Sequence, residues 1–344
     1  MTKTDHTDAP DAQRRRGLYF SGIQHMVHGE FKVPASYPAF VANADVDQDN
    51  LVEFALNQPI GPRFCEMYGE TSFNKVVQEY ILPIVKLFAK HRLKGDFAVF
   101  AGDSRSSFKI PTFCKSRDLM NPGNGVLLPL KRGRHFGTIK QVMENDLPFD
   151  EKETKLLWRG STTGPLNTST LRMRTGSRAF IPAAMKVVNS DNIDLGFTGI
   201  TGNVRTSNIP LSEFENAMRS HMTIPEQLKY KYLLCLEGND VATSLKWMMY
   251  SNSTVIMPHP TVESWACESF LRPFKHYVPV RSDLSDLQDV YDWCVANEGR
   301  CRQIAENGRR FMEAFLDETV ERKIETRVAM AYSERVSLKP RVSS

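Results

Sequence analysis

The sequence predicts an α/β protein built on parallel sheets that are covered by helices. The first observation is the segment Leu228–Pro258, in which two short apolar runs flank a helical pattern. A strand–loop–helix–strand unit of this kind is the repeating unit of such sheets. The second observation is that a similar loop, rich in small residues, follows another apolar run ending at Trp158. The third is the length of 344 residues, which is sufficient for two domains with separate cores.

Composition limits the class of protein and its surroundings. A formal net charge of +4 is too small for a dedicated nucleic-acid binder, although it allows weak attraction to anionic membranes. The six cysteines include no C-x-x-C pair, so we expect a reducing compartment and no structural zinc. Residues 1–16 predict a disordered tail without a signal peptide, and no apolar run approaches the roughly 20 residues of a membrane-spanning helix. We therefore expect a cytoplasmic protein that is at most peripheral at the inner face of the inner membrane.

A carboxylate follows the first predicted strand. Helical periodicity covers Phe73–Arg92, and the short apolar run Phe97–Phe100 predicts a strand. Asp103 comes shortly after this run, beyond a glycine, at the edge where open α/β sheets place their chemistry. An aspartate in this place can also cap a turn, so both roles stay open.

A compact basic turn follows the predicted strand Val126–Leu130. It contains Arg134 and His135, and a cluster of this kind can bind phosphate or simply be solvated. We treat both side chains as candidate contacts with a substrate phosphate.

A loop suited to an anion opens the second half of the chain. The mixed polar stretch from Gly137 to Lys155 marks the expected boundary between the halves, and Leu156–Trp158 predicts the end of a strand. The loop after it combines N–H groups, hydroxyls and a fixed positive charge. Arg172, on the next segment, is a further candidate for phosphate contact. The candidate residues of the loop are Arg159, Gly160, Ser161 and Thr162.

The Leu228–Pro258 unit contains a second candidate anion site. Tyr232–Leu236 predicts a strand, a polar loop follows, and the chain turns helical from Val241 until a second strand at Thr254–Met257. A helix N-terminus at the carboxyl end of a strand offers N–H groups to an anion. The standard dinucleotide and P-loop motifs are absent, so a turn without a ligand stays an alternative. The candidate residues are Gly238, Asn239, Thr243, Ser244 and Lys246.

The last part of the chain predicts further helices and a strand. Val262–Leu271 predicts a helix that places Glu268 near the carboxyl end of the preceding strand. Three more elements are expected: a strand at His276–Val280 and helices at Leu284–Ala296 and Gln303–Met330, the last followed by a disordered tail.

Three separated blocks in the right order resemble glycosyltransferase family 90. They are Trp158–Ser161, Tyr230–Pro258, and Leu271–Val280 with Asp283-Leu284 after it. The family contains capsule-associated and lipopolysaccharide-modifying transferases of microbes and protein O-glucosyltransferases of animals. The motif E-G-N-D-V-A-T-x-L-K-W is most similar to the bacterial lipopolysaccharide branch.

The resemblance implies a GT-B architecture, with two Rossmann-like domains and a central cleft. The implied parts are an acceptor-side domain at 17–150, a nucleotide-sugar domain at 151–315, and at 316–344 a helix returning toward the first domain plus a tail. The resemblance also implies an inverting, metal-independent transfer of glucose or xylose from a UDP-sugar to a lipopolysaccharide core or capsule glycan. The UDP-sugar is a co-substrate, and no cofactor is expected.

The resemblance also assigns roles to residues. Asp103 matches the general base of the family, and Arg159, Gly160 and Ser161 match its R-G-S loop. The segment from Gly238 to Lys246 matches its second nucleotide loop. For Glu268 we expect contact with the ribose hydroxyls of the nucleotide, with simple solvation as the alternative.

Two other classes of protein stay open. If Lys246 matches the lysine of this loop in the animal members, Ser244 stands where they carry an arginine. This difference keeps open a non-catalytic protein that binds nucleotide-sugars or glycans. A dinucleotide-dependent Rossmann oxidoreductase is the second alternative, and the missing G-x-G-x-x-G motif disfavours it.

Overall fold

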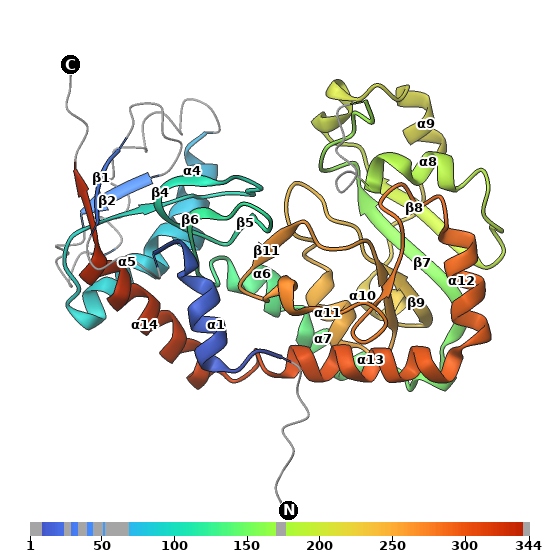
Figure 1. Ribbon diagram of the computed structural model, residues 1–344. Coiled ribbons are helices and arrows are strands. Elements are labelled where there is room, and N and C mark those ends of the chain that lie inside the picture. Colours follow the sequence, from blue (N-terminus) through green and yellow to red (C-terminus); the bar gives the residue numbers. More distant parts are fainter. Residues whose placement is uncertain are drawn as a thin grey trace, which may run out of the picture. The chain divides into compact units, whose positions relative to one another are not determined.

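The computed structural model describes residues 9–23, 29–33, 40–43, 51, 69–169 and 177–339. It is an α/β structure with parallel sheets, as the sequence predicts (Figure 1). The chain divides into two compact units. Unit 1 comprises Arg132–Thr261 and Glu268–Leu316, together with the first nine residues. Unit 2 comprises Pro10–Lys131, Val262–Cys267 and Asp317–Ser344.

Unit 1 is built on a five-stranded sheet in which every neighbouring pair of strands is parallel. The order across the sheet is β12-β10-β9-β7-β8. The central strands β9 and β10 are almost entirely buried and mostly apolar, as expected for a sheet covered on both faces. The bounds are β7 (Glu153–Ser161), β8 (Ile193–Gly199), β9 (Tyr230–Leu234), β10 (Thr254–Met257) and β12 (Val278–Pro279).

The strand order reverses direction between β7 and β9. From β7 the chain passes through α8 (Ile181–Ala184) to β8 on one side, whereas from β9 it passes through α11 (Leu245–Tyr250) to β10 on the other. Because such crossovers are right-handed, α8 and α11 cover opposite faces of the sheet (Figure 1). Open α/β sheets bind their ligands outside the carboxyl ends of the strands at a reversal of this kind. The topology therefore predicts a ligand site at the loops after β7 and β9.

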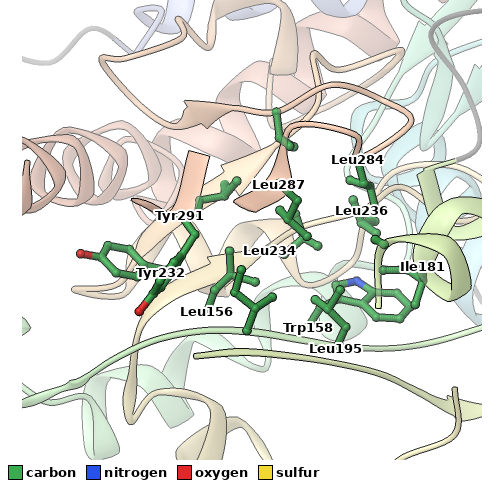
Figure 2. Packing of buried hydrophobic residues seen from close by; sticks show 14 of the residues in the cluster. Leu156, Trp158, Ile181, Leu195, Tyr232, Leu234, Leu236, Leu284, Leu287 and Tyr291 are labelled. Atoms are coloured by element: carbon green, nitrogen blue, oxygen red, sulfur yellow. The ribbon is translucent and has the colours of Figure 1, made fainter. Parts of the chain in front are cut away.

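A continuous apolar core fixes one face of this sheet. Figure 2 shows its side chains gathered from the strands and from α8 and α12 (Leu287–Ala296). The other helices of unit 1 are α6 (Arg132–Phe136), α7 (Ile139–Asn145), α9 (Leu211–Asn216), α10 (Ile224–Gln227) and α13 (Glu298–Glu313). Short 3-10 turns lie at Phe149–Glu151, Ser177–Phe180, Gly202–Thr206 and Glu268–Phe270.

Unit 2 contains a four-stranded sheet of order β2-β3-β4-β6, in which β2 is antiparallel to β3 and the other pairs are parallel. Its strands are β2 (Phe40–Asn43), β3 (Asp96–Val99), β4 (Phe108–Cys114) and β6 (Gly123–Leu127). Two-stranded pairs join β1 (Gly29–Lys32) to β13 (Val336–Lys339) and β5 (Ser116–Asp118) to β11 (Val262–Ser264). The helices are α1 (Ala12–Tyr19), α4 (Glu70–Val76), α5 (Leu82–His91) and α14 (Glu318–Arg335), with a π-helical turn at Val77–Ile81 and a 3-10 turn at Ser21–Ile23.

Two sequence predictions of helices are wrong. The segment Val262–Leu271 is not a helix, because Val262–Ser264 pairs with β5 as strand β11 and only Glu268–Phe270 turns helically. The long helix expected at Gln303–Met330 is two helices, because the side chain of Asp317 accepts hydrogen bonds from two backbone N–H groups and starts α14 anew.

Both chain ends also contain more structure than the sequence predicted. Residues 12–16, placed by the sequence in a disordered tail, lie in α1, and Arg15 forms a buried ion pair with Glu321 of α14. At the other end, β13 follows α14 where a tail was expected.

Candidate functional site

Three loops meet at the carboxyl ends of neighbouring strands in unit 1. They are the β7 loop (161–164), the β8 loop (199–203) and the β9 loop (237–240). The backbone N–H of Thr162 donates to the carbonyl of Gly199 at 3.0 Å, which joins the first two loops. These loops lie where the strand order reverses, and the sequence had selected two of them.

Two glycines allow the β7 and β9 loops to touch. Gly164 has φ = +95°, and a Cβ atom there would lie 2.7 Å from the carbonyl oxygen of Gly238. A Cβ at Gly238 would lie 2.8 Å from the hydroxyl of Thr163. Because any larger side chain would separate the loops, glycine is required for the close approach.

Hydrogen bonds then hold the three loops together. The N–H of Gly164 donates to Oδ1 of Asn239 at 2.9 Å, and Nδ2 of Asn203 donates to the carbonyl of Gly164 at 2.9 Å and to Oδ1 of Asn239 at 3.2 Å. The N–H of Thr201 donates to the buried hydroxyl of Thr162 at 2.7 Å. Of these residues, Thr162 and Asn239 are candidates from the sequence, whereas Asn203 and Thr201 lie in a segment without a recognisable motif.

The cation that spans the β7 and β9 loops is Arg178. Its Nη1 donates to the carbonyl of Ser161 at 2.9 Å and to the hydroxyl of Thr163 at 2.5 Å, and its Nη2 donates to the carbonyl of Leu236 at 3.0 Å. The guanidinium also lies 5.9 Å from the ring of Trp158. Arg178 is not a candidate from the sequence, because it belongs to no motif and lies outside both loops.

Arg159 bonds to groups outside these loops, on the edge strand β8 and at Ser220. Its Nη2 forms an ion pair of 2.6 Å with Oδ2 of Asp194 on β8, and Nε donates to the carbonyl of Ser220 at 3.3 Å. Its side chain is 8% exposed. Gly160 lies beside it in β7 and packs on the indole of Trp158. The structure thus gives Arg159 a role in joining β7 to β8.

Lys246 and Glu268 form a buried ion pair. The Nζ–Oε1 distance is 3.0 Å, and the side chains are 0% and 2% exposed. Lys246 lies in α11, and Ser244 occupies the N-cap position of this helix without a side-chain cap bond, next to Thr243. The sequence assigns Thr243, Ser244 and Lys246 to the diphosphate loop and Glu268 to the ribose, and in the structure Lys246 and Glu268 form an ion pair with each other.

A small pocket of about 30 Å³ adjoins the ion pair. The carboxylate of Glu237 accepts from the N–H of Thr261 at 2.8 Å and so ties the β9 loop to the segment after β10. Burial raises the pKa of the Cys235 thiol to about 12, so this side chain acts as a neutral apolar wall. The pocket is lined by Cys235, Glu237, Val241, Ala242, Leu245, Met257, Pro258, His259, Pro260 and Glu268.

Asp103 lies in unit 2, in the loop between β3 and β4. Its Oδ1 accepts from Nζ of Lys115 at 2.7 Å, and its side chain is 36% exposed while that of Lys115 is 4% exposed. The carboxylate is thus held by an ion pair to a buried ammonium group. The partial exposure leaves the carboxylate accessible to solvent.

The remaining candidates are the basic side chains. Arg134 is exposed on α6, whereas His135 on the same helix is buried. Arg172 lies outside the described residues. Within the described ranges, no cluster of three His, Cys, Asp or Glu side chains is arranged to hold a metal ion, and no helix is both long and apolar enough to cross a membrane.

Comparison with known proteins adds a family relationship. Residues 134–344 match the family described as "Glycosyl transferase family 90". The O-glucosyltransferase LpsA of Dichelobacter nodosus is 31% identical over 267 residues, which cover 76% of this chain and 74% of that protein. Protein O-glucosyltransferase 3 of Rattus norvegicus is 32% identical over 115 residues, covering 33% of this chain and 22% of its own length. Uncharacterized protein 035R of Invertebrate iridescent virus 3 is 31% identical over 179 residues, covering 49% of this chain and 16% of its own length.

Proposed function

Because the chain belongs to glycosyltransferase family 90, we propose that it transfers glucose or xylose from a UDP-sugar to a glycan acceptor with inversion at the anomeric carbon. The glycosyl transfer itself follows from the family and from the bacterial O-glucosyltransferase that covers most of the chain. The donor, the stereochemistry and the acceptor are our proposals.

The single observation that carries the proposed donor site is the meeting of the β7, β8 and β9 loops where the strand order reverses. A UDP leaving group develops negative charge on its diphosphate, and fixed cations and dipoles stabilise such charge without reorganising. Arg178 is a cation placed between these loops, where it donates to the carbonyls of Ser161 and Leu236 and to the hydroxyl of Thr163. By analogy with oxyanion holes, each well-placed donor contributes about 2.7–4 kcal/mol.

We propose that Asp103 is the general base. The acceptor hydroxyl gives its proton to the carboxylate while its oxygen forms a bond to the anomeric carbon. The bond from that carbon to the diphosphate oxygen breaks at the same time, and UDP leaves with the electron pair. Lys115 supports this role because its buried ammonium group holds the carboxylate in place by an ion pair of 2.7 Å.

The proposed architecture is GT-B, with the donor bound by unit 1 and the acceptor activated by unit 2. The proposed acceptor is a lipopolysaccharide core or capsule glycan, in keeping with the bacterial branch that the sequence resembles. We propose that the reaction needs no metal ion, so the protein groups must stabilise the leaving diphosphate themselves. A peripheral position at the cytoplasmic face of the membrane would suit such an acceptor.

A thermal-shift panel with UDP-glucose, UDP-xylose, UDP-galactose and GDP-mannose tests the donor. A ligand that binds only the folded state raises its stability by RT ln(1 + [L]/Kd), which is about 2.7 kcal/mol at a concentration of 100 Kd. We expect a clear rise in the melting temperature with UDP-glucose or UDP-xylose and none with GDP-mannose. A rise with GDP-mannose alone would contradict the proposed UDP site.

The variant Asp103→Asn tests the base. The amide has nearly the same shape but cannot accept the proton, so we expect sugar transfer to fall by about 10²–10⁴-fold while UDP binding is retained. Transfer is measured with radiolabelled donor and UDP binding by calorimetry. Asp118→Asn, on β5 of the same unit, is the matched control. Undiminished transfer by Asp103→Asn would remove Asp103 as the base.

A further inference from the structure

We propose that Asn203 is a positioning residue for the donor site, one that sets the spacing of the β7 and β9 loops. This inference rests on the proposed function, because it assigns a role to Asn203 within the same site. Asn203 lies in the 3-10 turn Gly202–Thr206, directly after β8, and does not belong to either of the loops that the sequence selected.

The geometry is a closed ring of hydrogen bonds around Gly164. The Gly164 N–H donates to Oδ1 of Asn239, and its carbonyl accepts from Nδ2 of Asn203. The ring is completed by the second bond of Asn203, from Nδ2 to Oδ1 of Asn239. One amide group of Asn203 therefore binds the β7 loop through a backbone carbonyl and the β9 loop through a side chain. We call Asn203 and Asn239 the asparagine latch.

The latch acts where the β7 and β9 loops are in direct contact. Gly164 and Gly238 are already in contact, with no room for a Cβ atom between them. Arg178 bridges the same two loops from its own side through Ser161 and Leu236. In the proposed site the diphosphate contacts both loops, so its affinity depends on a distance between the loops that is fixed before binding. The latch supplies this preorganisation without touching a reacting atom.

The β8 segment is also bonded to the β7 loop through Thr201, whose hydroxyl contacts Oδ1 of Asn203 at 3.2 Å as well. The Thr201 hydroxyl donates to the carbonyl of Thr162 at 2.7 Å, and the Thr201 N–H donates to the Thr162 hydroxyl. The backbone next to Asn203 is therefore already bonded to the β7 loop, and this sets the position of the Asn203 amide. This support explains how a half-buried side chain can impose a geometry on two other loops.

The test compares Asn203→Asp with Asn203→Ala. Aspartate keeps the volume of asparagine but replaces the donating Nδ2 by a charged oxygen that faces two acceptors, the Gly164 carbonyl and Oδ1 of Asn239. Alanine removes the donors without adding charge. We therefore expect the Kd of UDP and the KM of the UDP-sugar to rise about tenfold with alanine and further with aspartate. The kcat at saturating donor should stay within about twofold of wild type, since only donor binding is affected.

Asn208→Asp is the matched control. Asn208 lies on the same segment, and its Oδ1 accepts from the N–H of Thr168 at 2.8 Å, a bond that aspartate can keep. This variant should bind UDP like the wild type. Thermal unfolding of all variants verifies that they fold, and Asn203→Ala alone still tests the latch if Asn203→Asp does not.

The outcomes separate the latch from the proposed function. If the variants only lost packing, alanine would weaken UDP binding more than aspartate does, and this order would overturn the latch. A fall in kcat with an unchanged KM would overturn it too. UDP binding by wild type and equally by both Asn203 variants would overturn the latch and leave the proposed function intact. A wild-type protein that binds neither UDP nor any UDP-sugar would overturn both.

Discussion

The buried ion pair between Lys246 and Glu268 predicts that Lys246→Met destabilises the protein strongly. At 3.0 Å the two charges attract each other by about 5–6 kcal/mol at an effective dielectric constant of 20. The cost of removing both charges from water offsets much of this attraction, so the intact pair adds little net stability. Removing only the lysine takes the counter-charge from the buried Glu268 carboxylate, which costs about 3–5 kcal/mol.

Urea unfolding of the full chain, followed by tryptophan fluorescence, measures this effect in unit 1, because every tryptophan except Trp265 lies there. The double variant Lys246→Met/Glu268→Leu should recover most of the loss, since apolar side chains of similar volume replace a buried pair at little cost. Lys155→Met is the matched control, because Lys155 pairs with Glu153 at 3.5 Å while both remain exposed, and we expect little or no change.

A urea-unfolding midpoint of Lys246→Met equal to that of the wild type would refute this reasoning. A second result would be informative about function. The sequence assigned Lys246 and Glu268 to the donor, so a double variant that recovers its stability but loses UDP binding would show that the pair also contacts the nucleotide.

Three further predictions concern the same unit. Gly164→Ala should lower stability by about 1–3 kcal/mol and weaken UDP binding, because its φ is +95° and its Cβ would meet the Gly238 carbonyl, whereas Gly299→Ala, with open space around it, should fold normally in the same melting experiment. Arg178→Ala should weaken UDP binding by about 10–100-fold in calorimetry, and unchanged affinity would remove the arginine from the proposed diphosphate site. Burial raises the pKa of Cys235 from 9.0 to about 12, so the unfolded chain loses this proton first and stability should fall as the pH rises above about 9. Urea midpoints between about pH 8 and about pH 10 should fall less steeply for Cys235→Ala, and identical slopes would contradict the assignment.

The strands of unit 1 could be predicted because their apolar runs are short and sharply bounded. The run Thr254–Met257 is strand β10 itself, ended by Pro258. The run from Tyr232 to Leu236 contains most of β9, and Leu156–Trp158 is the centre of β7. Two of the three loops of the candidate site follow directly from these strands, because a parallel sheet brings its carboxyl ends to one edge.

The parts that the sequence could not predict depend on contacts between distant residues. The segment Val262–Leu271 has a helical pattern of apolar side chains, yet its backbone hydrogen bonds go to β5, far away in the chain. Arg159 belongs to the R-G-S motif, yet it forms an ion pair with Asp194 on the neighbouring strand. Arg178 belongs to no motif, but it lies between the β7 and β9 loops. Whether a charged side chain faces a ligand or a partner is thus decided by tertiary packing, which local sequence does not encode.

The pairing of β1 with β13 has a consequence for biosynthesis. Gly29 pairs with Val336, so this pair of strands in unit 2 joins two segments that lie far apart in the sequence. The sheet of unit 1, by contrast, is complete once β12 has left the ribosome at Pro279. The sheet of unit 1 can therefore form during translation before β13 is made, whereas the β1–β13 pair of unit 2 forms only after Val336–Lys339 has been synthesised.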